Sequence, residues 1–310
     1  MLLHVSLLLA GVLCAAVGGE LFVRGAVGIA RWLRVAPGII GATVAAFATS
    51  SPELSVSVQA SLTGTPRISL GDALGSNIVN IALILGLALA FSPIRVPRDT
   101  FRREIPLALG VAVAVPLLLL DGMLSRPEGC LLLSVFLAWA VWLVVEARKQ
   151  RDAAGAILGA GTLRVILPSL AAGLALLVAA GTLVVAGAEG IALRYGISEF
   201  VIGATIVALG TSMPELATTL ISKLRGHDEV GLGTVLGSNI FNCLFVVGVA
   251  AVICPIQAAF REVAAAGAFG LAAIASIWPG RSGRLGRGRG MVLLFLYGLY
   301  ATWIAVGRAG

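Results

Sequence analysis

One forty-residue block occurs twice in this chain, and the duplication constrains the fold more than any other feature. Residues 41–80 and 203–242 align without a gap at an offset of 162, and 19 of the 40 positions are identical. Each copy carries a TS-x-PEL motif near its start and ends on GSNI-x-N. We therefore expect two equivalent halves that bring these motifs together.

The sequence around both copies suits a lipid bilayer. Of the 310 residues, 59% are hydrophobic and 12% are charged, whereas a soluble domain is about a quarter charged. The first apolar run lacks the charged flank of a signal peptide and is too long for one, so we expect it to stay as a membrane helix.

Ten apolar segments approach the roughly 20 residues that cross a bilayer. They lie near residues 4–30, 36–62, 70–92, 103–122, 127–147, 163–188, 199–222, 231–254, 260–279 and 290–307. The predicted fold class is an all-α membrane protein with ten transmembrane helices in two five-helix repeats. Because five is odd, the second repeat enters from the opposite side and the repeats are inverted. We assign residues 1–147 to the first repeat, 148–162 to a cytoplasmic linker and 163–310 to the second.

The distribution of basic residues predicts the orientation. With the N-terminus outside, 17 of the 22 Lys and Arg residues fall on the cytoplasmic side, which places both termini outside. The basic segment at residues 281–290 has no aromatic residue for stacking and lies between membrane helices, so we expect no nucleic-acid partner. Short loops and the lack of a targeting segment favour a prokaryotic plasma (inner) membrane.

Each copy of the block places one carboxylate, Glu53 or Glu215, in a segment otherwise fit for lipid. A charge at such a depth costs about 2.5–3.5 kcal/mol, which indicates a functional role. Pro52 and Pro214 stand one residue earlier and remove a helical hydrogen bond, so each helix should kink and free a backbone carbonyl. Freed oxygens beside a carboxylate suit a cation.

Helical spacing gathers further oxygen atoms around the two glutamates. Residues three, four and seven positions before a glutamate share its helix face: Ser50, Thr49 and Ala46 in the first copy, and Ser212, Thr211 and Ala208 in the second. In the second motif, Ser76 and Asn80 share a face, as do Ser238 and Asn242. Hard cations such as Ca²⁺ and Na⁺ prefer such ligands, and no histidine or thiolate favours zinc, copper or iron.

Helix packing is the alternative explanation for the small polar residues. Gly, Ser and Asn at four-residue spacing also hold transmembrane helices together, but packing does not explain a repeated glutamate beside a proline. Glu20, Asp72 and Glu189 have no acidic counterpart in the other copy. Since each lies near an expected helix end, we expect it to be solvated or ion-paired.

The two motifs resemble the alpha repeats of the cation/calcium exchanger superfamily, most closely its prokaryotic sodium/calcium exchangers. The resemblance implies that the second, third, seventh and eighth helices form the ion-binding core and that the first and sixth slide across it. It also implies that the transported ions are bound by Thr49, Ser50, Glu53, Ser76, Asn80, Thr211, Ser212, Glu215, Ser238 and Asn242, with the carbonyls of Ala46 and Ala208.

Asn242 departs from some relatives, which carry an aspartate there. The two glutamates balance one Ca²⁺, two Na⁺ or two protons, and a third Na⁺ needs compensation by neutral ligands.

We predict a secondary antiporter that exchanges Ca²⁺ for Na⁺ by alternating access. A Ca²⁺/H⁺ antiporter is the main alternative, and a channel would need a continuous polar pore. The sequence contains no nucleotide-binding loop and no catalytic triad, so we do not expect an enzyme. We expect no cofactor either. The partners are ions and the bilayer, and a monomer is the simplest arrangement.

Overall fold

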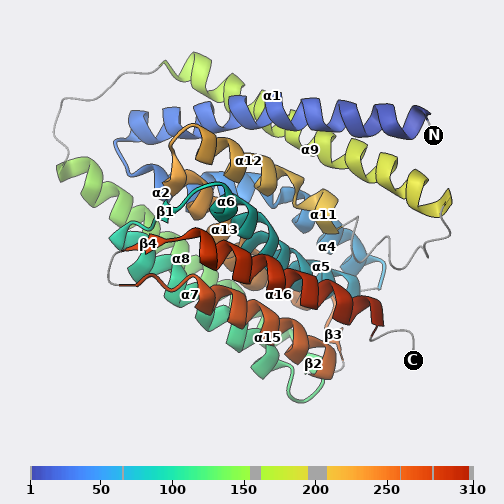
Figure 1. Cartoon of the computed structure of the whole chain (residues 1–310). Helices are drawn as coiled ribbons and strands as arrows, with labels where there is room; N and C mark the ends of the chain where they lie inside the picture. The colour runs from blue at the N-terminus through green and yellow to red at the C-terminus, as the bar shows by residue number, and fades with distance from the viewer. Residues whose placement is uncertain are drawn as a thin grey trace.

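The computed structural model describes residues 2–64, 66–153, 162–194, 208–258, 260–280 and 283–306. These residues form helices joined by short turns and four two-residue strands (Figure 1). The first half contains α1 (Leu2–Leu33), α2 (Pro37–Ile40), the π-helix η1 (Gly41–Ala45), α3 (Ala46–Thr49), α4 (Ser51–Leu62), α5 (Pro66–Ile78), the π-helix η2 (Val79–Leu85), α6 (Gly86–Phe91), β1 (Ile94–Arg95), α7 (Arg98–Leu118), β2 (Met123–Leu124) and α8 (Arg126–Ala153). The second half contains α9 (Leu163–Arg194), α11 (Ala208–Thr211), α12 (Met213–Leu224), α13 (Asp228–Phe241), the π-helix η5 (Asn242–Val246), α14 (Val247–Ile253), β3 (Ile256–Gln257), α15 (Phe260–Ser276), β4 (Arg284–Leu285) and α16 (Arg287–Val306).

Several of these helices can cross a membrane, so the chain is an integral membrane protein. Among the described residues, five helical stretches are long and apolar enough: Leu3–Leu33, Pro66–Phe91, Arg126–Lys149, Leu163–Leu183 and Asp228–Ile253. A sixth is the pair Pro37–Thr49 and Ser51–Leu62, bent by 44°. Helices also occupy the other expected ranges, except that residues 199–207 lie outside the described residues. The number of ten crossings, and their inversion, therefore stays a prediction.

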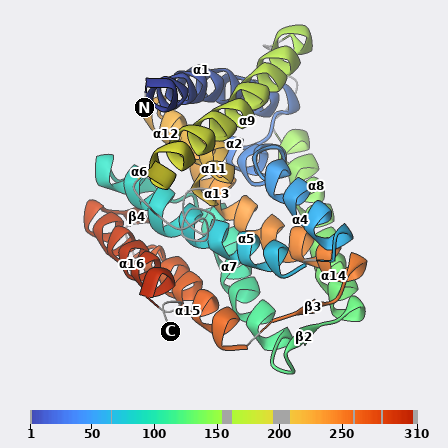
Figure 2. The same cartoon turned by 90° about the vertical axis from the view of Figure 1, so that its right-hand side faces the viewer.

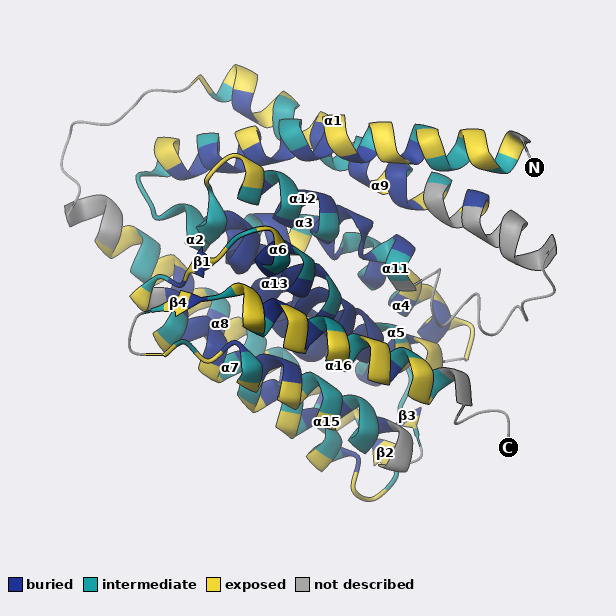
Figure 3. Cartoon of the chain, in the orientation of Figure 1, coloured by how far each residue is buried: buried dark blue, intermediate teal, exposed yellow. Residues whose placement is uncertain are grey.

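The spans differ in how deeply they are buried. In the most apolar window of each, 67% of α5–α6 and 78% of α13–α14 is buried, against 28% of α1, 17% of α8 and 22% of α9. Figure 3 shows the same contrast between the dark α13 and the yellow outer face of α1. In both views α1 and α9 lie together along one side of the bundle (Figures 1 and 2). The polar motifs of α5 and α13 therefore lie in the interior of the bundle.

Two short strand pairs join the halves at opposite ends of the molecule (Figure 1). Strand β1 pairs antiparallel with β4, and β2 pairs antiparallel with β3. The offset of 162 that relates the repeated blocks also relates Ile94 of β1 to Ile256 of β3. Each strand pair is thus the counterpart of the other, as expected if both halves fold alike and meet about a twofold relation.

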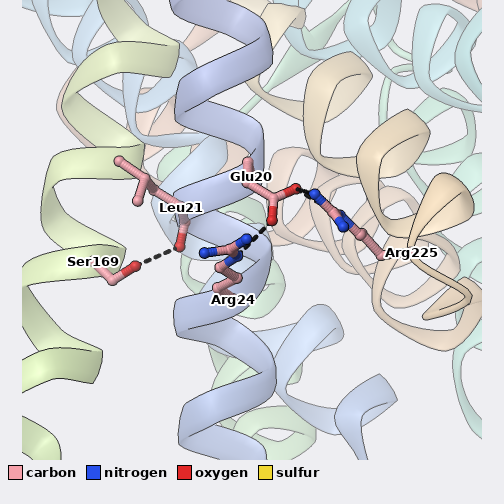
Figure 4. Close-up of polar contacts among 5 residues, drawn as sticks. All are labelled: Glu20, Leu21, Arg24, Ser169 and Arg225. Carbon is pink, nitrogen blue, oxygen red and sulfur yellow. Dashed lines mark hydrogen bonds and ion pairs between the residues drawn. The ribbon is translucent and has the colours of Figure 1, made fainter.

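Polar contacts tie α1 to both α9 and α12 (Figure 4). The Ser169 hydroxyl of α9 donates to the Leu21 carbonyl at 2.9 Å. Glu20 accepts hydrogen bonds from Arg24 at 2.5 Å and from Arg225, just after α12, at 2.7 Å. The expectation that Glu20 lies near a helix end is wrong, because it lies well inside α1, but its predicted ion pairing is confirmed. These partly exposed ion pairs contribute about 0–1 kcal/mol each.

Candidate cation site

Both TS-x-PEL motifs break their helix at the same place. Ser50 has φ −90° and ψ 11°, and Ser212 has φ −85° and ψ 7°, so neither continues the preceding helix. A new helix follows each serine and carries its proline in the first turn, where the missing N–H is no loss. The predicted kinks are confirmed. They place Glu53 and Glu215 in the first turns of α4 and α12, where the helix dipole favours negative charge by about 0.3–1 kcal/mol.

The break changes how the oxygen atoms reach the glutamates. Thr49 ends α3 and Glu53 belongs to α4, so the expectation that they share one continuous helix face is wrong. The carbonyl that Pro52 releases from helical bonding belongs to Ala48, and it accepts a hydrogen bond from the Ser51 hydroxyl at 2.8 Å. Ser51 therefore engages one of the two lone pairs of this oxygen.

The Ala46 carbonyl keeps some capacity for a cation. It accepts the Ser50 N–H at 2.9 Å and a long contact of 3.4 Å from the Thr49 hydroxyl. A carbonyl oxygen has two lone pairs, and the contact at 3.4 Å engages one of them only weakly. Its counterpart Ala208 is the first residue of α11, directly after residues outside the described part of the chain.

Two fully buried carboxylates form the centre of the site. Neither oxygen of Glu53 has a hydrogen-bond partner among the described residues. Glu215 Oε1 accepts hydrogen bonds from the hydroxyls of Ser50 at 3.0 Å and Ser238 at 3.1 Å, while its Oε2 has no partner in the same part of the chain. The bond from Ser50 crosses between the halves, so the structure brings the two motifs together. A buried, uncompensated carboxylate costs several kcal/mol, which a bound cation or a proton offsets.

Most of the other predicted ligands are buried as well. Thr49, Ser76, Ser212, Asn80 and Asn242 are fully buried. Four of these side chains present an oxygen for which the described residues provide no hydrogen-bond partner: Ser76 Oγ, Ser212 Oγ, Asn80 Oδ1 and Asn242 Oδ1. Thr211, at the end of α11, is only partly buried. Buried oxygens that lack donors are what a hard cation needs.

Sequence reasoning missed Asn77 and Asn239, the asparagines of the two GSN triplets. The side-chain nitrogen of Asn77 donates to the Asn239 carbonyl at 3.1 Å, and that of Asn239 donates to the Asn77 carbonyl at 3.0 Å. Together they join α5 to α13 at the middle of the bundle. Their identity in both copies at the offset of 162 was the available signal.

The π-helices also went unpredicted, and two of them occupy equivalent positions. The π-helix η2 contains Asn80 and η5 begins at Asn242, so the same irregularity occurs at equivalent positions of the two halves. A π-turn adds one residue to a turn, which rotates everything beyond it relative to an α-helix and is frequent at functional sites. The four-residue spacing from Ser76 to Asn80 predicts a shared helix face only where the backbone is α-helical, and Asn80 already lies in the π-helix.

The position of Asp72 differs from the one predicted. It lies inside α5 rather than at a helix end, and its Oδ2 is buried without a hydrogen-bond partner. It interacts electrostatically with both Glu53 and Glu215. The counterpart position holds Thr234, whose hydroxyl donates to the Val230 carbonyl at 2.9 Å. The electrostatic environment of the site is thus asymmetric. The side chain of Glu189 lies outside the described residues.

A membrane protein that holds buried carboxylates and open amide oxygens between broken helices belongs to the class of secondary ion transporters. Comparison with known proteins specifies the family. The family described as sodium/calcium exchanger protein matches residues 3–145 and 166–306, and the chain belongs to this family. The predicted resemblance is confirmed, and the family and structural neighbours are transporters rather than enzymes.

Individual relatives match along almost the whole chain. A putative antiporter, CaxA of Alkalimonas amylolytica, is 39% identical over 96% of this chain and 97% of its own length. The inner membrane protein YrbG of Escherichia coli is 36% identical over 99% of this chain and 97% of its own. A solved structure of the sodium-calcium exchanger NCX_Mj, soaked with Na⁺ and Ca²⁺, matches with a TM-score of 0.84 at 33% identity over 99% of both chains.

Proposed function

We propose that this protein is a secondary antiporter that exchanges Ca²⁺ for Na⁺ by alternating access at a site between Glu53 and Glu215. The observation that carries the proposal is the pair of fully buried carboxylates, three of whose oxygens have no hydrogen-bond partner within the part of the chain that the structure describes. Membership of the sodium/calcium exchanger family supports the choice of ions.

Charge balance explains the coupling. Two carboxylates neutralise one Ca²⁺ or two Na⁺, and both ions compete for the same oxygen atoms. The empty site would leave two charges in a dry core, so the protein resists crossing between states without an ion. The proposed ligands are the predicted set: Glu53, Glu215, Asn80, Asn242, Ser50, Ser212, Thr49, Thr211, Ser76 and Ser238, with the carbonyls of Ala46 and Ala208.

The proposed architecture places this site at the interface of two inverted repeats, residues 1–147 and 163–310, joined by a cytoplasmic linker at 148–162. Each repeat contributes five membrane helices, and both termini face outward from a prokaryotic inner membrane. The corresponding positions of the strand pairs and of the π-helices support two equivalent halves. A single chain contains both carboxylates, so a monomer suffices.

Protons are the rival counter-ion. Neither oxygen of Glu53 has a hydrogen-bond partner in the described ranges, and a proton would neutralise its charge just as a bound cation would. A channel is the third candidate and would conduct Ca²⁺ without a counter-ion.

Purified protein in liposomes distinguishes the three candidates when Na⁺, K⁺ and H⁺ gradients are applied separately. Ca²⁺ uptake driven by an outward Na⁺ gradient alone is the expected result. Uptake driven only by protons would replace Na⁺ by H⁺ in the mechanism. Flux that needs no counter-ion would indicate a channel and contradict antiport.

Replacing Asp72 by asparagine is expected to weaken Ca²⁺ binding more than Na⁺ binding. The removed charge interacts electrostatically with both glutamates and so acts on the ion between them. Because a divalent ion feels a given potential twice as strongly, the logarithm of the Ca²⁺ affinity should fall about twice as far as that of Na⁺. Competitive binding titrations at alkaline pH, where Asp72 carries its charge, measure both affinities. Asp121→Asn, in an exposed turn, should change neither. Equal effects of Asp72→Asn on the two ions would contradict a role through charge.

A further inference from the structure

Four asparagines form one hydrogen-bonded network across the two halves. Asn77 and Asn239 bond reciprocally to each other's backbone. Each also accepts a hydrogen bond from a proposed ligand asparagine of the opposite half. Asn80 Nδ2 donates to Asn239 Oδ1 at 3.1 Å, and Asn242 Nδ2 donates to Asn77 Oδ1 at 3.2 Å. Every bond has a counterpart at the offset of 162. The network therefore repeats the relation between the two halves.

These bonds determine which end of each ligand amide is free. A side-chain amide carries an oxygen acceptor and a nitrogen donor on the same planar group. Since the nitrogens of Asn80 and Asn242 are engaged, their oxygens remain, and both oxygens are buried with no donor from the described residues. Rotating either amide by half a turn would place two acceptors opposite each other and leave the donor nitrogen at the free end. The network thus selects the end that a cation can bind.

We infer that Asn77 and Asn239 are positioning residues that hold the Asn80 and Asn242 oxygens available for the transported cation and keep position 242 an amide. This inference rests on the proposed function. Neither residue touches the ion in this mechanism, because each acts through the amide it receives.

The same contacts disfavour the aspartate that some relatives carry at position 242. A carboxylate there would set its oxygen against Asn77 Oδ1, where two acceptors repel. Rotating the Asn77 amide would relieve this clash. Its nitrogen, however, already donates to the Asn239 carbonyl at 3.1 Å and to Cys243 Sγ at 3.0 Å. The network therefore favours a site whose two charges are those of the glutamates.

A double-mutant cycle separates positioning from simple helix packing. If Asn239 acts through Asn80, Asn239→Ala should weaken Ca²⁺ binding about tenfold in the unaltered chain but less than about twofold in the Asn80→Ala background. The matched control is Asn242, which makes no hydrogen bond to the Asn239 side chain. The fold losses of Ca²⁺ affinity caused by Asn239→Ala and by Asn242→Ala should therefore multiply in the double variant. The readout is equilibrium Ca²⁺ binding by the purified full chain, with thermal unfolding recorded for each variant.

Multiplicative effects in both cycles would overturn the positioning role while leaving the proposed function intact. An unaltered chain that binds no Ca²⁺ would overturn both. If the alanine variants do not fold, Asn239→Asp and Asn239→Leu provide a second test. Asp keeps the acceptor oxygen for Asn80 and loses only the donor to the Asn77 carbonyl, whereas Leu, of similar size, loses both. Asn239→Leu should therefore weaken Ca²⁺ binding more than Asn239→Asp, and equal binding by the two folded variants would contradict the inference.

Discussion

Glu53→Gln and Glu215→Gln are each expected to abolish Na⁺-driven Ca²⁺ uptake into liposomes. Either substitution leaves one carboxylate to balance a divalent ion in a fully buried site. Removing one partner of a buried charge pair costs about 3–5 kcal/mol, which corresponds to a loss of more than a hundredfold in affinity. Glutamine keeps the size and one oxygen of glutamate, so the change tests charge rather than packing. Isotope uptake at a fixed Na⁺ gradient measures the effect.

Glu229→Gln is the matched control for these variants. Glu229 belongs to the first turn of α13, and its side chain is 32% exposed. Water already solvates this carboxylate, so its loss should leave uptake close to that of the unaltered chain. Unchanged uptake by both buried variants would refute the site. A loss by one variant alone would show that the two glutamates do not act as a pair.

Gly237→Ala is expected to lower the free energy of unfolding by about 1–3 kcal/mol and to weaken ion binding. A Cβ at this position of α13 would lie 2.5 Å from the Ala42 carbonyl oxygen and 2.8 Å from the Ala46 Cβ. The Ala42 carbonyl belongs to backbone in η1, so the clash is relieved only if the helices move apart. That movement would displace α3 and Thr49, which lie directly before the helix break. Thermal unfolding and Ca²⁺ titration of the same sample measure the two effects.

Gly110→Ala controls for the general effect of removing a glycine from a membrane helix. An added Cβ at Gly110 of α7 meets nothing within 4 Å among the described residues. Alanine favours a helix by up to about 1 kcal/mol over glycine, so this variant should be as stable as the unaltered chain or more so. Equal losses of stability in the two variants would show that the close contact between α13 and η1 is not the cause.

Local chemistry explains which features of the site were predictable. A proline in a helix removes a hydrogen bond wherever it occurs, so Pro52 and Pro214 predicted the breaks from sequence alone. Duplication predicted that Glu53 and Glu215 belong together, and the contact between Ser50 and Glu215 agrees with it. Apolar length likewise predicted a helical membrane protein.

Features that depend on contacts between the halves were not predictable. The pairing of Asn77 with Asn239 arises only when α5 and α13 meet, and asparagine in a glycine-rich segment is equally typical of helix packing. The burial of the Asp72 Oδ2 atom depends likewise on packing around α5. Short-range spacing also failed where the backbone left the α-helix, at Ser50 and in the π-helices. Spacing along one helix cannot predict that Ser50 bonds to the glutamate of the other half.

Locating a cation in crystals of this protein tests most directly whether the two glutamates share one ion. Crystals soaked with Sr²⁺, a heavier and larger analogue of Ca²⁺, should show an anomalous peak bound by carboxylate oxygens of both Glu53 and Glu215, at distances slightly longer than the roughly 2.3–2.6 Å typical of Ca²⁺ ligands. A peak bound by only one of these glutamates, or one bound by neither, would contradict the shared site.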